Sequence, residues 1–233
     1  MSFKKVTDES GIFFVSSLIS VPHRFTTRTG KPDTAYVTPS KQLHGDRICP
    51  VGKNEIGNGP ECDGLLCTEP GVTVAIRTAD CVPVLLYAEK KGAAGEKERA
   101  VCAVHSGWKG SAKNIAGKAV RQLCALGFAP KDVRTAVGAC IHACCFEVKQ
   151  DVIDAFSSVP LVGDLARDCV YHRGDRTFAD LPMIVAAELT AAGVPKEQID
   201  VCPECTCCDP SLFYSYRAEG RLNGSMYAMI SIG

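Results

Sequence analysis

Histidine and tryptophan are scarce in this chain, which has five histidines and one tryptophan among its 233 residues. Long apolar runs are also missing, since no stretch approaches the roughly 20 apolar residues that a membrane-spanning helix needs. Neither sign of charge is in excess, because 26 basic residues balance 26 acidic ones. The chain therefore has no global positive field to attract a polyanion, and we expect neither nucleic acid nor a membrane as its partner.

The N-terminal sequence also lacks the features of a secretory signal. Residues 1–17 contain two lysines, then acidic residues and only a brief apolar run, without an extended apolar core or a cleavage site. We therefore expect a cytoplasmic protein. The sequence leaves its oligomeric state open.

Cysteine, in contrast, is abundant, with fourteen residues. In a short secreted chain this number would indicate a disulfide scaffold, but here 46% hydrophobic content is ample for a packed core. We expect most cysteines to be reduced, buried, small hydrophobic residues. The adjacent pairs Cys144/Cys145 and Cys207/Cys208 support this expectation, because neighbouring cysteines rarely satisfy disulfide geometry with each other.

The distribution of apolar residues predicts strands and helices without strict βαβ alternation. Strands are expected at 72–78, 82–87, 100–104, 133–137, 146–148, 211–217 and 226–232, helices at 111–126, 151–156 and 180–192, and solvated loops at 53–62 and 89–99. The pattern favours an α+β fold, a single domain over residues 1–233 with mixed β-sheets flanked by helices.

Two helices carry the clearest signals. The helix at 111–126 places Ile115 and Ala119 at helical spacing and is followed by Gly127, a typical C-terminal capping residue. The helix at 180–192 has Asp180 available as N-cap and Gly193 just past its end.

Three residues of metal-binding type occur in distinctive contexts, namely His44 in QLHGD, Cys81 in TADC and His105 in HSGWKG. Imidazole and thiolate are good zinc ligands, and three protein ligands with an open fourth position are typical of catalytic zinc. Their separations along the chain are long, so spacing alone does not distinguish a metal site from ordinary loop or core residues.

Longer motifs give these three residues a common context. The chain resembles the YfiH family, also called the laccase-domain or multicopper polyphenol oxidase-like family, in runs that recur in family order from residue 41 to the end. These runs are QLHGDRI, DGLLCTEPGVTVAIRTADCVPVLLY, AVHSGWKGSAKNIAGKAV, CCFEV and CTCCDPSLFYSYRAEGRLNGSMYAMI.

The resemblance implies that His44, Cys81 and His105 bind Zn²⁺, with copper as a less favoured metal. It also implies purine nucleoside chemistry, which is phosphorolysis of adenosine, inosine, guanosine or methylthioadenosine together with adenosine deamination. The partners would then be a purine nucleoside and phosphate. In deamination the metal would activate a water for attack at C6 of adenine.

Further site residues follow from their positions around these motifs. Asp80 either orients the water or accepts its proton, or else it satisfies a buried backbone group. The turn with Ser106, Gly107 and Lys109 leads into a helix, where exposed N–H groups could hold phosphate. Trp108, within the same turn, either stacks on a base or packs under the helix.

Two arginines are additional candidates for binding phosphate, Arg28 in the T-R element and Arg217 in the S-Y-R element. For each of them a surface ion pair is the alternative. We also expect Arg28, together with Asp80, Cys81 and His105, to take part in catalysis.

Two departures from the family pattern bear on the site. Only residues 31–40 separate the T-R-x-G element from the run that begins at residue 41, so this N-terminal region is shortened and part of the usual pocket wall is expected to be missing or rebuilt. The family's I-G-P-C-C is replaced by I-H-A-C-C, in which His142 is expected to be a partly exposed structural histidine.

One alternative to nucleoside chemistry is a copper-dependent polyphenol oxidase, and three others follow. A complete four-copper oxidase is excluded, because its sites need on the order of ten histidines. Cys81 and His105 could instead form the nucleophile and base of a cysteine hydrolase. The run from Cys202 to Cys208 offers a C-x-x-C spacing for a non-enzymatic metal-binding protein. Editing of cell-wall precursors has been attributed to bacterial relatives, and nothing in this sequence distinguishes that function from nucleoside chemistry.

Overall fold

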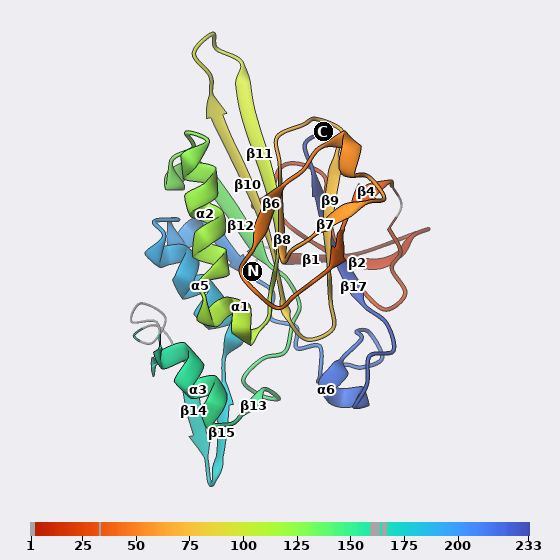
Figure 1. Ribbon diagram of the computed structural model, residues 1–233. Coiled ribbons are helices and arrows are strands. Elements are labelled where there is room, and N and C mark those ends of the chain that lie inside the picture. The colour runs from red at the N-terminus through yellow and green to blue at the C-terminus, as the bar shows by residue number, and fades with distance from the viewer. Residues whose placement is uncertain (1–2, 33, 159–163, 165–166) are drawn as a thin grey trace.

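Two six-stranded sheets form the centre of the protein in the computed structural model, which describes residues 3–32, 34–158, 164 and 167–233 (Figure 1). The sheets pack against each other, and helices cover the outer face of one of them. The α+β fold with mixed sheets flanked by helices is thus confirmed.

The helix-covered sheet contains the longest strands. Its order is β16 (Ile199–Val201), β12 (Val133–Val137), β10 (Val82–Lys91), β11 (Lys97–Ser106), β8 (Gly64–Cys67) and β6 (Ile48–Pro50). Strand β10 is buried on both faces over its first seven residues, which explains its nearly continuous apolar sequence. Val84 and Leu86 face the helices, whereas Leu85 and Tyr87 face the second sheet.

The second sheet brings the two ends of the chain together. Its order is β1 (Phe3–Asp8), β2 (Gly11–Ser16), β3 (His23–Thr26), β17 (Met226–Ser231), β9 (Thr73–Thr78) and β4 (Tyr36–Val37). A three-stranded sheet of β13 (Glu147–Val148), β15 (Arg176–Ala179) and β14 (Val170–Arg173) and a pair of β5 (Pro39–Lys41) and β7 (Gly59–Glu61) complete the strands described.

Five α-helices are bounded in the described residues. They are α1 (Trp108–Ala112), α2 (Ile115–Ala125), α3 (Gln150–Ser157), α5 (Leu181–Ala191) and α6 (Tyr216–Glu219), joined by the 3₁₀ turns η1 (Lys53–Glu55), η2 (Pro130–Asp132) and η3 (Lys196–Gln198). The prediction for 180–192 is confirmed by α5, because the Asp180 carboxylate accepts a hydrogen bond from Met183 N and Gly193 has a φ of 96°.

The helix predicted at 111–126 is in fact two helices. Asn114 adopts a left-handed conformation with a φ of 56°, and its side chain caps α2 by accepting a hydrogen bond of 3.0 Å from Gly117 N. A Cβ atom at Gly117 would lie only 2.2 Å from Asn114 Oδ1, so this cap requires glycine. The cap breaks the predicted helix and lets α1 begin earlier, directly after the end of β11.

The strand predicted at 211–217 is wrong. The Asp209 carboxylate accepts a hydrogen bond from Leu212 N at 3.1 Å, and its carbonyl accepts one from Phe213 N at 3.0 Å, which closes a turn. Ser215 then caps the short helix α6 through its hydroxyl. Local side-chain capping therefore overrides the strand preference of the aromatic residues here.

The loops predicted at 89–99 and 53–62 are shorter than expected. Strands β10 and β11 continue as a hairpin to Lys91 and from Lys97, because Glu89 bridges the two strands by ion pairs with Lys97 and Arg99 at 2.9 Å. The segment 53–62 contains η1 and β7.

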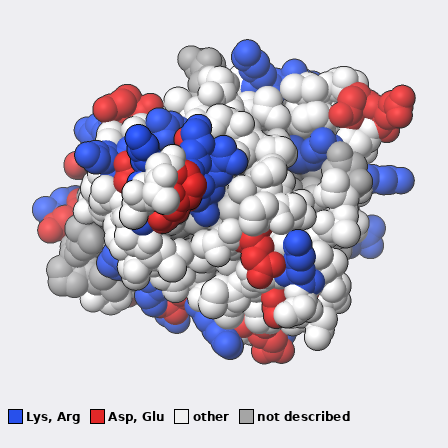
Figure 2. All heavy atoms as spheres, turned by 90° about the horizontal axis from the view of Figure 1, so that it is seen from above, with Lys and Arg blue, Asp and Glu red and all other residues white. Residues whose placement is uncertain are grey.

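Charged side chains of both signs are interspersed on the face seen in Figure 2. Within the described part of the chain, no helix combines the length and apolar character needed to cross a membrane.

Candidate metal centre

The structure brings His44, Cys81 and His105 together from three separate segments. His44 lies in the loop between β5 and β6, Cys81 in the turn between β9 and β10, and His105 in β11. The antiparallel register of β10 and β11 pairs Pro83 with His105, which places the preceding Cys81 beside the end of β11. Their potential ligand atoms all lie within 4.8 Å of one another, and the two imidazole rings are nearly perpendicular.

A buried carboxylate orients two of the three residues. Asp63, fully buried, accepts hydrogen bonds through Oδ1 from His105 Nδ1 and from His44 N, both at 2.9 Å, and through Oδ2 from Gly45 N at 2.8 Å. Because Nδ1 bonds to Asp63, Nε2 is the ring nitrogen left for the hydrogen bond between His105 and the Cys81 side chain. The bonds from the backbone hold the loop at His44, which has a φ of 53°.

Sequence reasoning missed Asp63. The only local signal was an acidic residue directly before the wholly buried strand β8. Its position beneath two of the predicted ligands is typical of the carboxylate that orients metal-binding histidines.

Cys81 and His105 stabilise each other's charged forms. Burial opposes the Cys81 thiolate, but His105 and His44 more than compensate and lower the pKa of the thiol below its ordinary value. Burial likewise opposes the charged form of His105, but the Cys81 thiolate and Asp63 raise its pKa. Thiolate is the form of cysteine that binds metals, and a metal ion bound here would displace the proton from His105.

Gly107 and Gly110 permit the close approach of the ligand loops. A Cβ atom at Gly107 would lie 3.0 Å from Sγ of Cys81 and 3.3 Å from Cδ2 of His44. One at Gly110 would lie 2.9 Å from the carbonyl oxygen of Gly45. Both glycines of the HSGWKG motif are therefore required by packing around the three predicted ligands.

The three residues line a cavity of about 690 Å³, a volume in the range of small-molecule sites. The other lining residues combine aromatic, cationic and neutral side chains. They are Ser40, Lys41, Gln42, Arg77, Thr78, Ala79, Asp80, Trp108, Ile141, Phe146, Leu181, Tyr216, Arg217, Leu222 and Ser225. Trp108 also packs against the core beneath the helices, as one of its two alternatives expects, while stacking on a base stays a prediction.

Of the cationic residues in this wall, Arg217 was singled out from the sequence, whereas Lys41 and Arg77 were not. Ser40 and Lys41 come from the end of the shortened N-terminal region and from β5, so this region contributes to the wall. Nothing local in the sequence marks Lys41 or Arg77, because only the packing of β5 and β9 around the cavity brings them there.

Asp80 lines the cavity, but its carboxylate is occupied. Oδ1 accepts a hydrogen bond from the Thr206 hydroxyl and Oδ2 accepts one from Arg217 N, both at 2.7 Å. Asp80 also has a φ of 97°, and its carbonyl oxygen accepts a hydrogen bond from Ile141 N. These contacts match the alternative in which Asp80 satisfies a buried backbone group.

Four other predicted residues are absent from the cavity lining in the described part of the chain. Arg28 forms an ion pair with Glu219, donates to the Phe213 carbonyl at 3.2 Å and lies over the Tyr214 ring. The remaining three belong to the turn before α1. The Ser106 hydroxyl is buried against that of Ser111, Gly107 caps α1, and Lys109 lies 5.4 Å from the Trp108 ring centroid.

His142 is also absent from that lining. It is partly buried, as expected for a structural histidine, and burial lowers its pKa.

The chain is similar to several known proteins. The family model described as "multi-copper polyphenol oxidoreductase laccase" matches residues 22–233. A purine nucleoside phosphorylase of Deinococcus radiodurans is 36% identical over 92% of this chain and 90% of its own length. The purine nucleoside phosphorylase YlmD of Geobacillus stearothermophilus is 34% identical over 82% of this chain and 70% of its own.

A solved structure supports the same relationship. The hypothetical protein YfiH of Bacillus licheniformis superposes with a TM-score of 0.85 at 25% identity and covers 98% of this chain and 99% of that one. With a family model that spans nearly the whole sequence, these similarities show that the chain belongs to the laccase-like YfiH family.

Proposed function

We propose that this protein is a cytoplasmic, zinc-dependent purine nucleoside phosphorylase acting on adenosine, inosine, guanosine or methylthioadenosine. The observation that carries the proposal is the convergence of His44, Cys81 and His105 in the wall of a cavity that also holds aromatic and cationic side chains. The names of two relatives, both purine nucleoside phosphorylases, support the same activity.

The donor set fits zinc. Two imidazoles and one thiolate leave a fourth position open, as in catalytic zinc sites, and the Asp63 carboxylate orients one imidazole from behind. When bound, zinc would act as a Lewis acid that polarises a substrate oxygen or water. A complete multicopper centre does not fit, because the whole chain has only five histidines.

The cavity wall supplies the groups that a nucleoside and phosphate need. Trp108, Phe146 and Tyr216 offer flat apolar surfaces for a purine. Arg77 and Arg217 offer positive charge for phosphate. In phosphorolysis a phosphate oxygen forms a bond to C1 of ribose while the bond from C1 to the base breaks, and the bonding electrons leave with the purine, which takes up a proton.

Arg217 is held in place by its neighbours. Its Nη1 donates to the Cys145 carbonyl at 2.9 Å and its Nη2 to the Glu147 carbonyl at 3.1 Å, while its backbone N donates to Asp80. In this proposal Asp80 and Arg28 act on catalysis indirectly. Asp80 positions Arg217, and Arg28 holds the end of α6 through Glu219.

The pairing of Cys81 with His105 also favours a second candidate, a cysteine hydrolase with a lowered thiol pKa. The two candidates make opposite use of the thiolate, because a sulfur that binds zinc is not free to attack a substrate. Alkylation of Cys81 before and after chelation, together with the metal content, separates them. Rapid labelling of Cys81 in protein without bound metal would favour the hydrolase.

The decisive experiment is a nucleoside panel with the zinc-loaded protein, in the presence and absence of inorganic phosphate. We expect free base and ribose-1-phosphate only when phosphate is present, and loss of this turnover in Cys81→Ser. Cys124→Ser is the matched control, since Cys124 is a half-buried thiol on α2 outside the predicted ligands. Conversion of adenosine to inosine without phosphate would indicate deamination, and no turnover of any nucleoside would contradict the proposal.

A further inference from the structure

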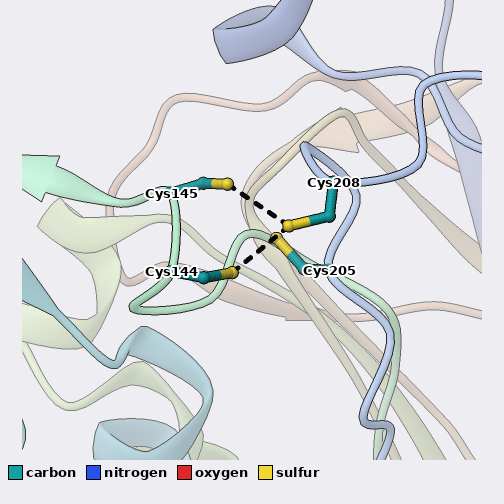
Figure 3. A group of neighbouring side chains, drawn as sticks. All are labelled: Cys144, Cys145, Cys205 and Cys208. Carbon is teal, nitrogen blue, oxygen red and sulfur yellow. Dashed lines mark hydrogen bonds between the residues drawn. The ribbon is translucent and has the colours of Figure 1, made fainter.

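Four cysteines that are far apart in the sequence meet beside the cavity. Cys144 and Cys145 lie between β12 and β13, and Cys205 and Cys208 lie after β16 (Figure 3). We expect most cysteines to be buried, and Cys205 is, but Cys144 and Cys208 are exposed and differ from that expectation. A cluster of four thiols with two exposed members requires an explanation other than apolar packing.

We propose that Cys144, Cys145, Cys205 and Cys208 bind one zinc ion in a closed, structural site that is separate from the His44/Cys81/His105 centre. The two groups share no residue, and they differ in the way that structural and catalytic zinc sites differ. The first offers four sulfur ligands and no open position, whereas the second offers three ligands and an open one.

The sulfur positions match a single tetrahedral ion. Sγ of Cys208 lies 3.4 Å from Sγ of Cys144 and 3.4 Å from Sγ of Cys145, and all four sulfurs lie within 4.8 Å of one another. Zinc–sulfur bonds of about 2.3 Å in a tetrahedron place the sulfurs about 3.8 Å apart, whereas a disulfide needs about 2.05 Å. Cys208 has two equally near partners, which suits a shared ion better than one disulfide.

The backbone around the four sulfurs is already held in place. Cys140 and Cys205 form a β-bridge, and Thr206 N donates to the Cys140 carbonyl at 2.9 Å, which joins the two cysteine segments. His142 N lies 3.4 Å from Sγ of Cys205 and donates to it, a contact that stabilises negative charge on sulfur. The ligands therefore need little rearrangement to surround an ion.

The structure also separates these four cysteines from their neighbours in the same run. Cys202 is fully buried in the core between the two sheets, and Cys207 packs against the core beneath the helices. The C-x-x-C spacing that ligates is thus the one from Cys205 to Cys208, completed by two cysteines some sixty residues earlier in the chain.

The ion would fix part of the cavity wall. Phe146 follows directly after Cys145 and lines the cavity, and the Cys145 carbonyl accepts a hydrogen bond from Arg217. Binding of the ion would therefore hold the segment that carries Phe146 against the segment that leads to α6. The ion has a structural role in this inference. The inference does not depend on the proposed nucleoside activity.

Metal stoichiometry tests the inference without any activity measurement. The full chain is purified under reducing conditions in the presence of zinc. The molar ratio of zinc to protein is then measured by inductively coupled plasma mass spectrometry. We expect two zinc ions in the wild-type protein, and one each in Cys208→Ser, in Cys144→Ser and in His44→Ala. Cys207→Ser is the matched control and should keep two, because Cys207 lies in the same run outside the group.

Cobalt substitution identifies which site is filled. The near-ultraviolet sulfur-to-cobalt charge-transfer absorption of His44→Ala should remain strong, since four thiolates remain, whereas Cys208→Ser should lose most of it. Removing the metal from His44→Ala should also lower its melting temperature. Wild-type protein with a single zinc ion that Cys208→Ser retains would overturn the inference, as would a disulfide within the group in reduced protein or iron in place of zinc.

Discussion

Nδ1 of His105 donates a hydrogen bond of 2.9 Å to Oδ1 of Asp63, and both side chains are almost completely buried. The same carboxylate accepts hydrogen bonds from the backbone of the His44 loop. One acidic residue therefore orients a predicted ligand on β11 and the loop that carries a second one. Burial tends to raise the pKa of Asp63, but His105 and these backbone donors lower it below its ordinary value. The ionised carboxylate, which only accepts hydrogen bonds, is therefore favoured.

Replacing Asp63 with asparagine tests this arrangement. Asp63→Asn puts an amide donor in place of one acceptor oxygen and removes the negative charge, so the remaining oxygen cannot accept all the hydrogen bonds from His105 and from the backbone of the His44 loop. We expect zinc affinity at the His44/Cys81/His105 site to fall by about 10–100-fold, measured by competition with a chelator. Asp46→Asn, which breaks the partly exposed ion pair with Lys118, is the control. Equal affinities in the two variants would contradict the assignment.

Gly107→Ala should disturb the same centre by crowding. The added Cβ atom would meet Cys81 Sγ at 3.0 Å, so the sulfur or the loop must shift. We expect a loss of zinc from this site, with a stability loss of about 1–3 kcal/mol, the usual cost of overpacking. Metal content and thermal melting followed by circular dichroism measure the two effects. Full zinc content at unchanged affinity would show that the loop relaxes without affecting the ligands.

Arg217→Ala should weaken phosphate binding. A charge-assisted hydrogen bond contributes about 1.5–3 kcal/mol, which corresponds to roughly a 10–150-fold higher KM for phosphate, with a smaller change in KM for the nucleoside. Arg221→Ala is a suitable control, because Arg221 is exposed nearby and does not line the cavity. Steady-state kinetics with phosphate as the varied substrate measure this effect. Equal KM values for phosphate in both variants would show that Arg217 does not bind phosphate.

Glu188 on α5 predicts a pH dependence of stability. It is fully buried, and burial raises the pKa of its carboxyl well above the ordinary 4.5, although Ala116 N donates to Oε2. Above pH 4.5 the unfolded chain releases this proton while the folded chain keeps it. Folding stability therefore falls as pH rises above 4.5, by up to about 1.4 kcal/mol per pH unit, until the folded pKa is reached.

Glu188→Gln removes that ionisation with little change of shape. We expect the variant to unfold at higher temperature than the wild type near pH 7.5, with a smaller difference near pH 5. Thermal melting across this pH range measures the effect, and Glu197→Gln, at an exposed position, is the control. A difference independent of pH would mean that Glu188 is ionised in the folded protein.

Local patterns in the sequence were sufficient for much of the secondary structure. The helix after Asp180 and the strands around Cys81 and His105 follow from spacing, capping and apolar runs within a few residues of each other. Sequence motifs also named the three predicted ligands, through a family resemblance rather than through their spacing. The strand expected at 211–217 failed because capping by Asp209 and Ser215 is decided by side-chain geometry that apolar periodicity does not report.

The sequence by itself therefore determined most of the strand and helix content, the absence of a full multicopper centre and the identity of the three predicted ligands. Only the tertiary structure decided what surrounds them. Asp63 lies 42 residues from His105, and Cys208 lies 63 residues from Cys145. Such pairs depend on strand register and on how loops pack at the ends of sheets, because contacts between distant segments form only when the whole core is assembled.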